Sequence, residues 1–226
     1  MDKGKVWVVI AAYNEEKVIS ETISNVLAEI DNVVVVDDCS LDDTAQRALD
    51  AGAHILCHPI NLGQGAALQS GIEYALKNGC EYIVTFDADG QHNAVEIIPM
   101  LRALQNSGAD IALGSRFLGK TMNISWQRRV VLKLAITFTR FTTGIKLTDV
   151  HNGFRIMHRR FFDIFSFRQN RMAHASEILN HIAARHIAYI EFPVTITYTE
   201  YSILKGQKSS NALRVVMELF TGHVSK

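Results

Sequence analysis

The sequence predicts an α/β fold in which a mostly parallel central sheet has helices on both faces. In the first half of the 226-residue chain, short β-rich runs alternate with longer stretches of helical period. This order is typical of parallel strands joined by helices. The run Val33–Val36 is apolar at every position, which indicates a strand buried on both faces.

Local patterns predict each element of the first half in turn. Val6–Ala12 is a short β-rich run, so we expect it to be the first strand. Glu15–Glu29 has apolar residues at helical spacing, and Leu41–Leu49 is a second helix with Asp42 or Asp43 as its cap. The remaining expected elements are strands at Val33–Val36, His54–Cys57, Tyr82–Phe86 and Asp110–Leu113, and helices at Gln64–Lys77 and Ala94–Gln105.

The second half of the chain is less regular. Helical spacing predicts helices over Arg128–Thr142 and Ala173–Arg185, and Asp149–Ile156 reads as a loop followed by a strand. Ile187–Tyr198 is an extended run that Pro193 interrupts. The tail is polar and basic, with a last short helix expected at Ala212–Phe220.

Composition narrows the classes of function and the cellular location. The chain has 23 basic and 23 acidic residues, which argues against bulk nucleic-acid binding because that needs a basic excess. Its three cysteines form no CxxC pair, so we expect reduced thiols and a cytoplasmic protein. No signal peptide is visible, and no segment reaches the ~20 apolar residues that span a bilayer.

Two carboxylates and an amide follow the apolar run Tyr82–Phe86 directly. Asp87, Asp89 and Gln91 lie where a buried strand gives way to a loop, and the carboxyl end of a strand is where open α/β sheets bind ligands. Mg²⁺ and Mn²⁺ prefer such oxygen ligands and keep positions open for water and phosphate. We therefore expect Asp87, Asp89 and Gln91 to hold Mg²⁺ or Mn²⁺.

Polar and acidic side chains also follow two other predicted strands. Ala11 to Glu15 ends the first strand, and Asp37-Asp38 ends the second. In a parallel sheet these ends share one edge, where Tyr13 could stack on a base and the acids could accept hydrogen bonds from a base or a ribose. The alternative is that the acids only cap the helices that follow them.

Several motifs, taken in order, resemble the family 2 inverting glycosyltransferases and, more narrowly, their dolichyl- or polyprenyl-phosphate sugar transferase branch. The quoted motifs are Tyr13-Asn14-Glu15, Val36 to Thr44, Asn61-Leu62-Gly63-Gln64-Gly65, Asp87 to His92, Gly114-Ser115-Arg116-Phe117 and Asn152-Gly153-Phe154-Arg155. The resemblance covers about Val6 to Ala212 and implies a GT-A-type nucleotide-sugar fold. It also implies one domain, 1–226, with a nucleotide-sugar-binding half (1–118) and an acceptor-binding half (119–226).

The resemblance also assigns roles to residues. At the nucleoside it implies Ala11, Tyr13, Glu15 and one of Asp37 or Asp38, and at the diphosphate and metal it implies Asp87, Ala88, Asp89 and Gln91. It places Arg116 and Arg155 near the donor and acceptor phosphates. Lys208 would lie in a basic loop that closes over the diphosphate. The chain departs from many relatives at Ala11, where proline is common, and at Gln64, where lysine is common. It also lacks the QxxRW motif of processive synthases and the membrane-spanning helices of many polyprenyl-phosphate transferases.

Three functions fit these residues. The first is metal-dependent, inverting transfer of a sugar from a nucleotide-sugar to a polyprenyl phosphate, whose anionic oxygen needs no strong base. The second is transfer to a hydroxyl of a glycolipid or surface-polysaccharide precursor, which needs a base, and Glu177 is the candidate. The third is a non-catalytic nucleotide-sugar-binding subunit.

The stretch Arg128–Phe141 is basic and amphipathic, with Trp126 at its boundary. Such a helix can lie in a membrane interface, although its periodicity also fits a helix that faces the core. The resemblance favours the membrane, so we expect peripheral contact with its cytoplasmic face. Because no spanning segment is visible, a separate membrane-anchoring protein is a further expectation.

Overall fold

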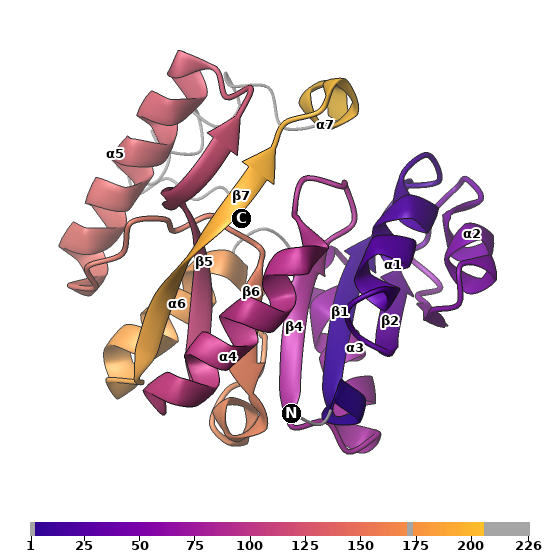
Figure 1. Cartoon of the computed structure of the whole chain (residues 1–226), viewed down its shortest axis with the longest axis horizontal. Helices are drawn as coiled ribbons and strands as arrows, with labels where there is room; N and C mark the ends of the chain where they lie inside the picture. The colour runs from indigo at the N-terminus through magenta and orange to yellow at the C-terminus, as the bar shows by residue number, and fades with distance from the viewer. Residues whose placement is uncertain (1–2, 171–173, 206–226) are drawn as a thin grey trace.

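The computed structural model describes residues 3–170 and 174–205, and in this part of the chain seven strands form one sheet (Figure 1). Their order across the sheet is β3-β2-β1-β4-β6-β5-β7. The strands are β1 (Val6–Ala12), β2 (Asn32–Asp37), β3 (His54–Cys57), β4 (Tyr82–Asp87), β5 (Ile111–Met122), β6 (Arg155–His158) and β7 (Tyr189–Thr197).

The sheet is mostly parallel, as predicted. β3, β2, β1 and β4 run in parallel, and β5 pairs in parallel with β7. Only β6, among the described strands, is antiparallel to its neighbours β4 and β5. The carboxyl ends of β1, β2 and β4 therefore meet at one edge, since Ala12 pairs with Asp37 and Ala11 pairs with Asp87.

Helices cover both faces of the sheet (Figure 1). They are α1 (Ile19–Leu27), α2 (Thr44–Asp50), α3 (Gln64–Lys77), α4 (Ile97–Ser107), α5 (Trp126–Thr143), α6 (His174–Arg185) and α7 (Glu200–Lys205), with short 3₁₀ turns at Lys3–Lys5, Ala94–Glu96 and Arg159–Asp163. Alternate residues of β1 face opposite cores: Val8 packs with residues of α1 and α4, and Val9 packs with residues of α3 and α6.

Most expected elements are confirmed, and β1, β3 and α3 have the predicted bounds. The expected helix over Glu15–Glu29 begins only at Ile19, and the backbone N–H of Glu15 donates to Thr44 Oγ1 of α2 (2.7 Å). β5 continues nine residues past its expected end at Leu113 and pairs with β7, with a shift of register between Ser115 and Lys120.

Pro193 does not interrupt β7, contrary to the prediction. The residue pairs with Ser115 inside a continuous strand. β7 is the last strand of the sheet, and an edge strand has a side on which a missing N–H costs no ladder bond. The helix α7 was not predicted, and the helix expected at Ala212–Phe220 lies outside the described residues.

The proposed boundary between residues 118 and 119 falls within β5, a continuous strand next to the edge strand β7. The division into two functional halves stays a prediction. Of the helices that the structure describes, none is both long enough and apolar enough to cross a membrane.

Candidate active site

A cleft of about 470 Å³ opens at the carboxyl edge of the sheet. Residues from the ends of β1, β4 and β7, from the starts of α3 and α5 and from the segment before β6 form its walls. Of the residues predicted from the sequence, the cleft brings together Ala11, Tyr13, Glu15, Asp38, Asp87, Ala88, Asp89, Gln91 and Arg116.

Tyr13 and Glu15 form one end of this cleft, in the turn that follows β1. Asn14 between them has a left-handed backbone (φ 55°), and its backbone N–H donates to Ser40 Oγ at 2.8 Å. Glu15 is 9% exposed, and its Oε2 accepts a hydrogen bond from the Tyr201 hydroxyl of α7 (2.9 Å). The turn thus holds Tyr13, which is 42% exposed, as an aromatic surface on the cleft.

Asp38 lines the cleft and anchors the loop that precedes α3. Its Oδ1 accepts from the backbone N–H of Leu62 (2.9 Å), and its Oδ2 accepts from that of Gly63 (2.6 Å). His58 Nδ1 also lies 2.8 Å from Oδ1. The neighbouring Asp37 is not among the lining residues, because its carboxylate turns to the backbone N–H and hydroxyl of Ser40.

Asp87 is held in place by contacts from three sides. Its Oδ2 lies 2.9 Å from His92 Nε2, and its Oδ1 accepts from Gln64 Nε2 at 3.3 Å. Gly153 packs directly on the carboxylate, and a Cβ at that position would lie 2.4 Å from Oδ2. A third of the Asp87 side chain stays exposed in the cleft, so the carboxylate is fixed but accessible.

Asp89 completes a strongly acidic end of the cleft. Burial and the nearby Asp87 carboxylate raise the pKa of Asp89 to about 6. Its Oδ1 accepts from the backbone N–H of Gln91 (3.1 Å). Among the described residues no group of three or more His, Cys, Asp or Glu side chains is arranged to hold a metal. Two mutually repelling carboxylates with open neighbouring space nevertheless fit Mg²⁺ or Mn²⁺, which take one or two carboxylates and complete their shell with phosphate and water.

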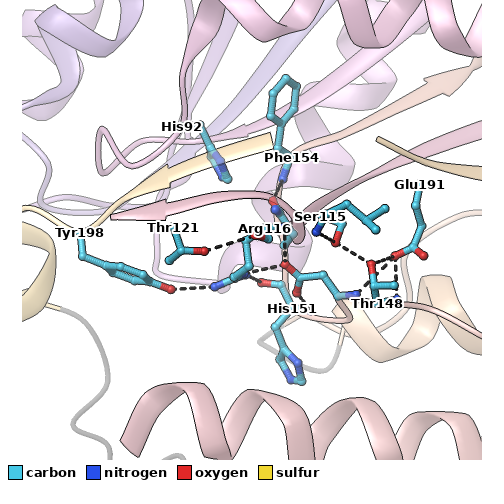
Figure 2. A network of polar contacts seen from close by, with 12 residues as sticks. His92, Ser115, Arg116, Thr121, Thr148, His151, Phe154, Glu191 and Tyr198 are labelled. Carbon is cyan, nitrogen blue, oxygen red and sulfur yellow. Dashed lines mark hydrogen bonds and ion pairs between the residues drawn. The ribbon is translucent and has the colours of Figure 1, made fainter. Parts of the chain in front are cut away.

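Arg116 also lines the cleft and is almost completely buried in a polar network (Figure 2). Its Nε donates to Asp149 Oδ2 (2.6 Å), its Nη1 to the Tyr198 hydroxyl (2.7 Å) and its Nη2 to the backbone carbonyl of His151 (3.0 Å). Glu191 in turn accepts from the backbone N–H (2.8 Å) and hydroxyl (2.7 Å) of Thr148. Arg116 is therefore held directly by Tyr198, which follows β7, and indirectly by Glu191 of β7, which fixes the backbone of Thr148 and Asp149.

Of the other predicted residues, Arg155 and Glu177 do not line the cleft. Arg155 is 4% exposed in β6, and burial lowers its pKa to about 10 although Asp87 and Asp149 oppose the shift. The carboxylate of Glu177 in α6 accepts from the backbone N–H groups of Arg168 (3.1 Å) and Gln169 (3.0 Å), so it fastens the turn before this helix. Lys208 lies outside the described residues.

Sequence reasoning gave no role to His92, Asp149 or Tyr198. His92 follows Gln91 directly in the sequence, so the motif itself could have identified it as a site residue. Asp149 and Tyr198 are 33 and 82 residues away from Arg116 in the sequence, and no local pattern connects them.

Comparison with known proteins identifies the family of the chain. The family model "Glycosyl transferase family 2" matches residues 7–165. The polyprenol monophosphomannose synthase of Mycolicibacterium smegmatis is 29% identical, over 90% of this chain and 81% of the relative. The UDP-N-acetylglucosamine–dolichyl-phosphate N-acetylglucosaminyltransferase of Methanococcus voltae is also 29% identical, over 89% of each chain.

The fold has a solved counterpart. The glucosyl-3-phosphoglycerate synthase of Mycobacterium tuberculosis, crystallised with Mn²⁺, UDP-glucose and phosphoglyceric acid, superposes with a TM-score of 0.67 at 17% identity, covering 98% of this chain and 81% of that one. This likeness concerns the fold, which is of the GT-A type. Because the family model matches well over half of its length, the chain belongs to the family 2 glycosyltransferases and is a glycosyltransferase.

Proposed function

We propose that the protein transfers one sugar, with inversion, from a nucleotide-sugar to the phosphate of a polyprenyl phosphate, with Mg²⁺ or Mn²⁺ as cofactor. The observation that carries the proposal is the presence of both kinds of charge in one cleft: the lining includes the acids Asp87 and Asp89 as well as Arg116 and Arg128. The two carboxylates would suit a cation that offsets the charge of the donor diphosphate, and the two guanidinium groups would suit an anionic acceptor. The relatives named above for polyprenol or dolichyl phosphate support this acceptor class.

Each cleft residue has a role in this reaction. Tyr13 would stack on the nucleobase, and Glu15 and Asp38 would accept hydrogen bonds from the nucleoside. Asp87 and Asp89, with the Gln91 amide, would hold the metal, which stabilises the negative charge of the departing diphosphate. His92 and Gln64 keep Asp87 in position for this contact.

The bond changes need no strong base. A phosphate oxygen of the acceptor attacks the anomeric carbon from the side opposite the diphosphate, so the new C–O bond forms as the old one breaks and the configuration inverts. The attacking oxygen is already anionic near neutral pH, and Arg116 and Arg128 would orient it. Catalysis then depends on positioning and on charge stabilisation.

Transfer to a sugar hydroxyl is the weaker candidate, because it needs a general base at the cleft. Both oxygens of Glu177 accept from backbone N–H groups in the turn before α6, and this residue does not line the cleft. The match to a glycosyltransferase family model argues against a non-catalytic nucleotide-sugar-binding subunit.

We further propose that α5 contacts the cytoplasmic face of the membrane. Its exposed apolar residues follow one helical stripe: Trp126, Val130, Leu134 and Phe141 are 74%, 47%, 44% and 91% exposed. Arg128 in its first turn also lines the cleft, so a lipid held by α5 would have its phosphate near the reacting groups. A separate membrane-anchoring protein would strengthen this contact.

The proposal is tested by incubating the purified protein with UDP-, GDP- and dTDP-sugars, Mn²⁺ and undecaprenyl phosphate, with lipid products read by mass spectrometry. We expect one donor to give a glycosyl phosphoryl lipid. Undecaprenol, which has the same lipid without the phosphate, is the matched control and should give no product. Transfer to undecaprenol, or to added glycolipid hydroxyls alone, would favour the second candidate.

A further inference from the structure

We propose that Tyr198 is a positioning residue that sets two guanidinium groups, those of Arg116 and Arg128, against the anionic acceptor. This inference rests on the proposed function, because it assigns Tyr198 to the acceptor side of that reaction. Tyr198 follows β7 directly and is 2% exposed, so it does not itself line the cleft. Its influence on the acceptor must therefore act through the two arginines.

The backbone fixes the position of Tyr198. Its N–H donates to the carbonyl of Met122 (3.3 Å), and its own carbonyl accepts from Asn123 Nδ2 at 3.4 Å. Both partners belong to the far end of β5 or to the residue that follows it. The ring is therefore held at the point where β5 leads into α5.

The Tyr198 hydroxyl positions Arg116. It accepts from Nη1 at 2.7 Å, while Asp149 binds Nε and the His151 carbonyl binds Nη2 (Figure 2). These contacts come from three directions, so the guanidinium plane has a fixed orientation. A guanidinium has five N–H donors, so one N–H on each Nη nitrogen is not used by these bonds.

The Tyr198 ring positions Arg128. The Arg128 Cζ atom lies 4.6 Å from the ring centroid, a distance typical of a cation–π contact. No carboxylate in residues 3–170 and 174–205 forms an ion pair with Arg128, whereas Arg116 has Asp149 as its counterion. Arg128 is therefore a cation held in place by an aromatic face, and its charge is available to an anion in the cleft.

One side chain thus connects α5 to the interior of the sheet. The hydroxyl contacts a residue of β5, and the ring contacts a residue in the first turn of α5. Removing the hydroxyl alone should disturb Arg116, and removing the whole ring should release Arg128 as well. The two halves of the contact can therefore be separated by substitution.

The test compares Tyr198→Phe and Tyr198→Leu for the KM of undecaprenyl phosphate, the KM of the nucleotide-sugar, kcat and the melting temperature. We expect Tyr198→Leu to raise the acceptor KM about tenfold, which corresponds to about 1.4 kcal/mol, while the donor KM stays within about twofold. Tyr198→Phe keeps the ring under Arg128 and should raise the acceptor KM only about threefold. Tyr189→Phe, which removes a hydroxyl at the other end of β7, is the matched control and should change neither KM.

A double variant adds a sharper criterion. Arg128→Gln should raise the acceptor KM, and adding Tyr198→Leu should then cost less than it does in the wild type, because both changes remove the same contact. Fully additive effects, or equal rises in both KM values, would overturn the inference. Should Tyr198→Leu fail to fold, an unchanged acceptor KM in Tyr198→Phe would overturn it.

The wild-type measurements keep this inference distinct from the proposed function. Transfer to undecaprenyl phosphate by the wild type, with no change in acceptor KM in the variants, would reject Tyr198 alone. Absence of transfer by the wild type with every donor would reject both.

Discussion

At the residue scale, the buried ion pair between Arg116 and Asp149 fixes the place of the Arg116 cation at the cleft. The two side chains are 7% and 1% exposed, and Asp149 also accepts from the backbone N–H of Arg116 (3.1 Å). Such a pair holds a cation at a fixed place, but removing one partner leaves an uncompensated buried charge. Arg116 is therefore both a structural residue and a residue of the cleft.

We expect Asp149→Ala to lower the free energy of unfolding by roughly 3–5 kcal/mol, because Arg116 then stays buried without its counterion. Urea denaturation followed by circular dichroism measures this change. Arg129→Ala removes an exposed charge in α5 and should change stability by less than about 0.5 kcal/mol. Equal free energies of unfolding for the two variants would show that the ion pair does not stabilise the fold.

Gly153 offers a second test at this scale. A Cβ at this position would lie 2.4 Å from Asp87 Oδ2, so Gly153→Ala should push the carboxylate away from His92 and out of its place in the cleft. We expect at least about a tenfold loss of kcat and weaker Mn²⁺ binding in the presence of nucleotide, since a displaced ligand weakens both contacts. Titration calorimetry and steady-state rates measure the two effects. Normal values of both would mean that Asp87 is not fixed by Gly153.

At the scale of elements, the sequence predicted the helices and strands that local patterns encode. It did not predict the features that depend on pairing between strands distant in the sequence. The spacing of apolar residues gave β1, β3 and α3 their bounds, because burial of each element follows its own period. The extension of β5 to Met122 and the continuity of β7 through Pro193 depend on the pairing of these two strands, which no local pattern records. For the same reason the sequence motifs identified Asp87 and Asp89 as site residues, whereas the contacts of Asp149 and Tyr198 with Arg116 are visible only in the structure.

The exposed stripe of α5 leads to a prediction for this element. Wild-type protein should float with anionic liposomes, because apolar side chains insert and each basic residue near the surface adds about 1 kcal/mol. Trp126→Glu with Phe141→Glu replaces two exposed residues and should abolish flotation without lowering the melting temperature. Leu41→Glu with Leu49→Glu changes two exposed apolar residues outside α5 and is the control, for which flotation should persist. Equal flotation of the two double variants would contradict a role for α5.

At the scale of the whole molecule, the parallel order of β2, β1 and β4 places three strand ends at one edge of the sheet. That order explains why residues as distant in sequence as Tyr13, Asp38 and Asp87 line one cleft. β5 supplies Arg116 to the same cleft, and Tyr198, which follows β7, accepts a hydrogen bond from Arg116. The fold thus gathers acidic and basic side chains from distant parts of the sequence in one cleft.

The central claim, metal-dependent transfer to a polyprenyl phosphate, is tested most directly by one reconstitution experiment. Wild-type protein and Asp89→Ala are treated with EDTA, returned to Mn²⁺ or Mg²⁺, and supplied with radiolabelled nucleotide-sugar and undecaprenyl phosphate. We expect label in the lipid fraction only for the wild type with metal, and a loss of several kcal/mol of transition-state stabilisation in Asp89→Ala with an unchanged melting temperature. Lipid labelling that persists in EDTA, or that is normal in Asp89→Ala, would contradict the account.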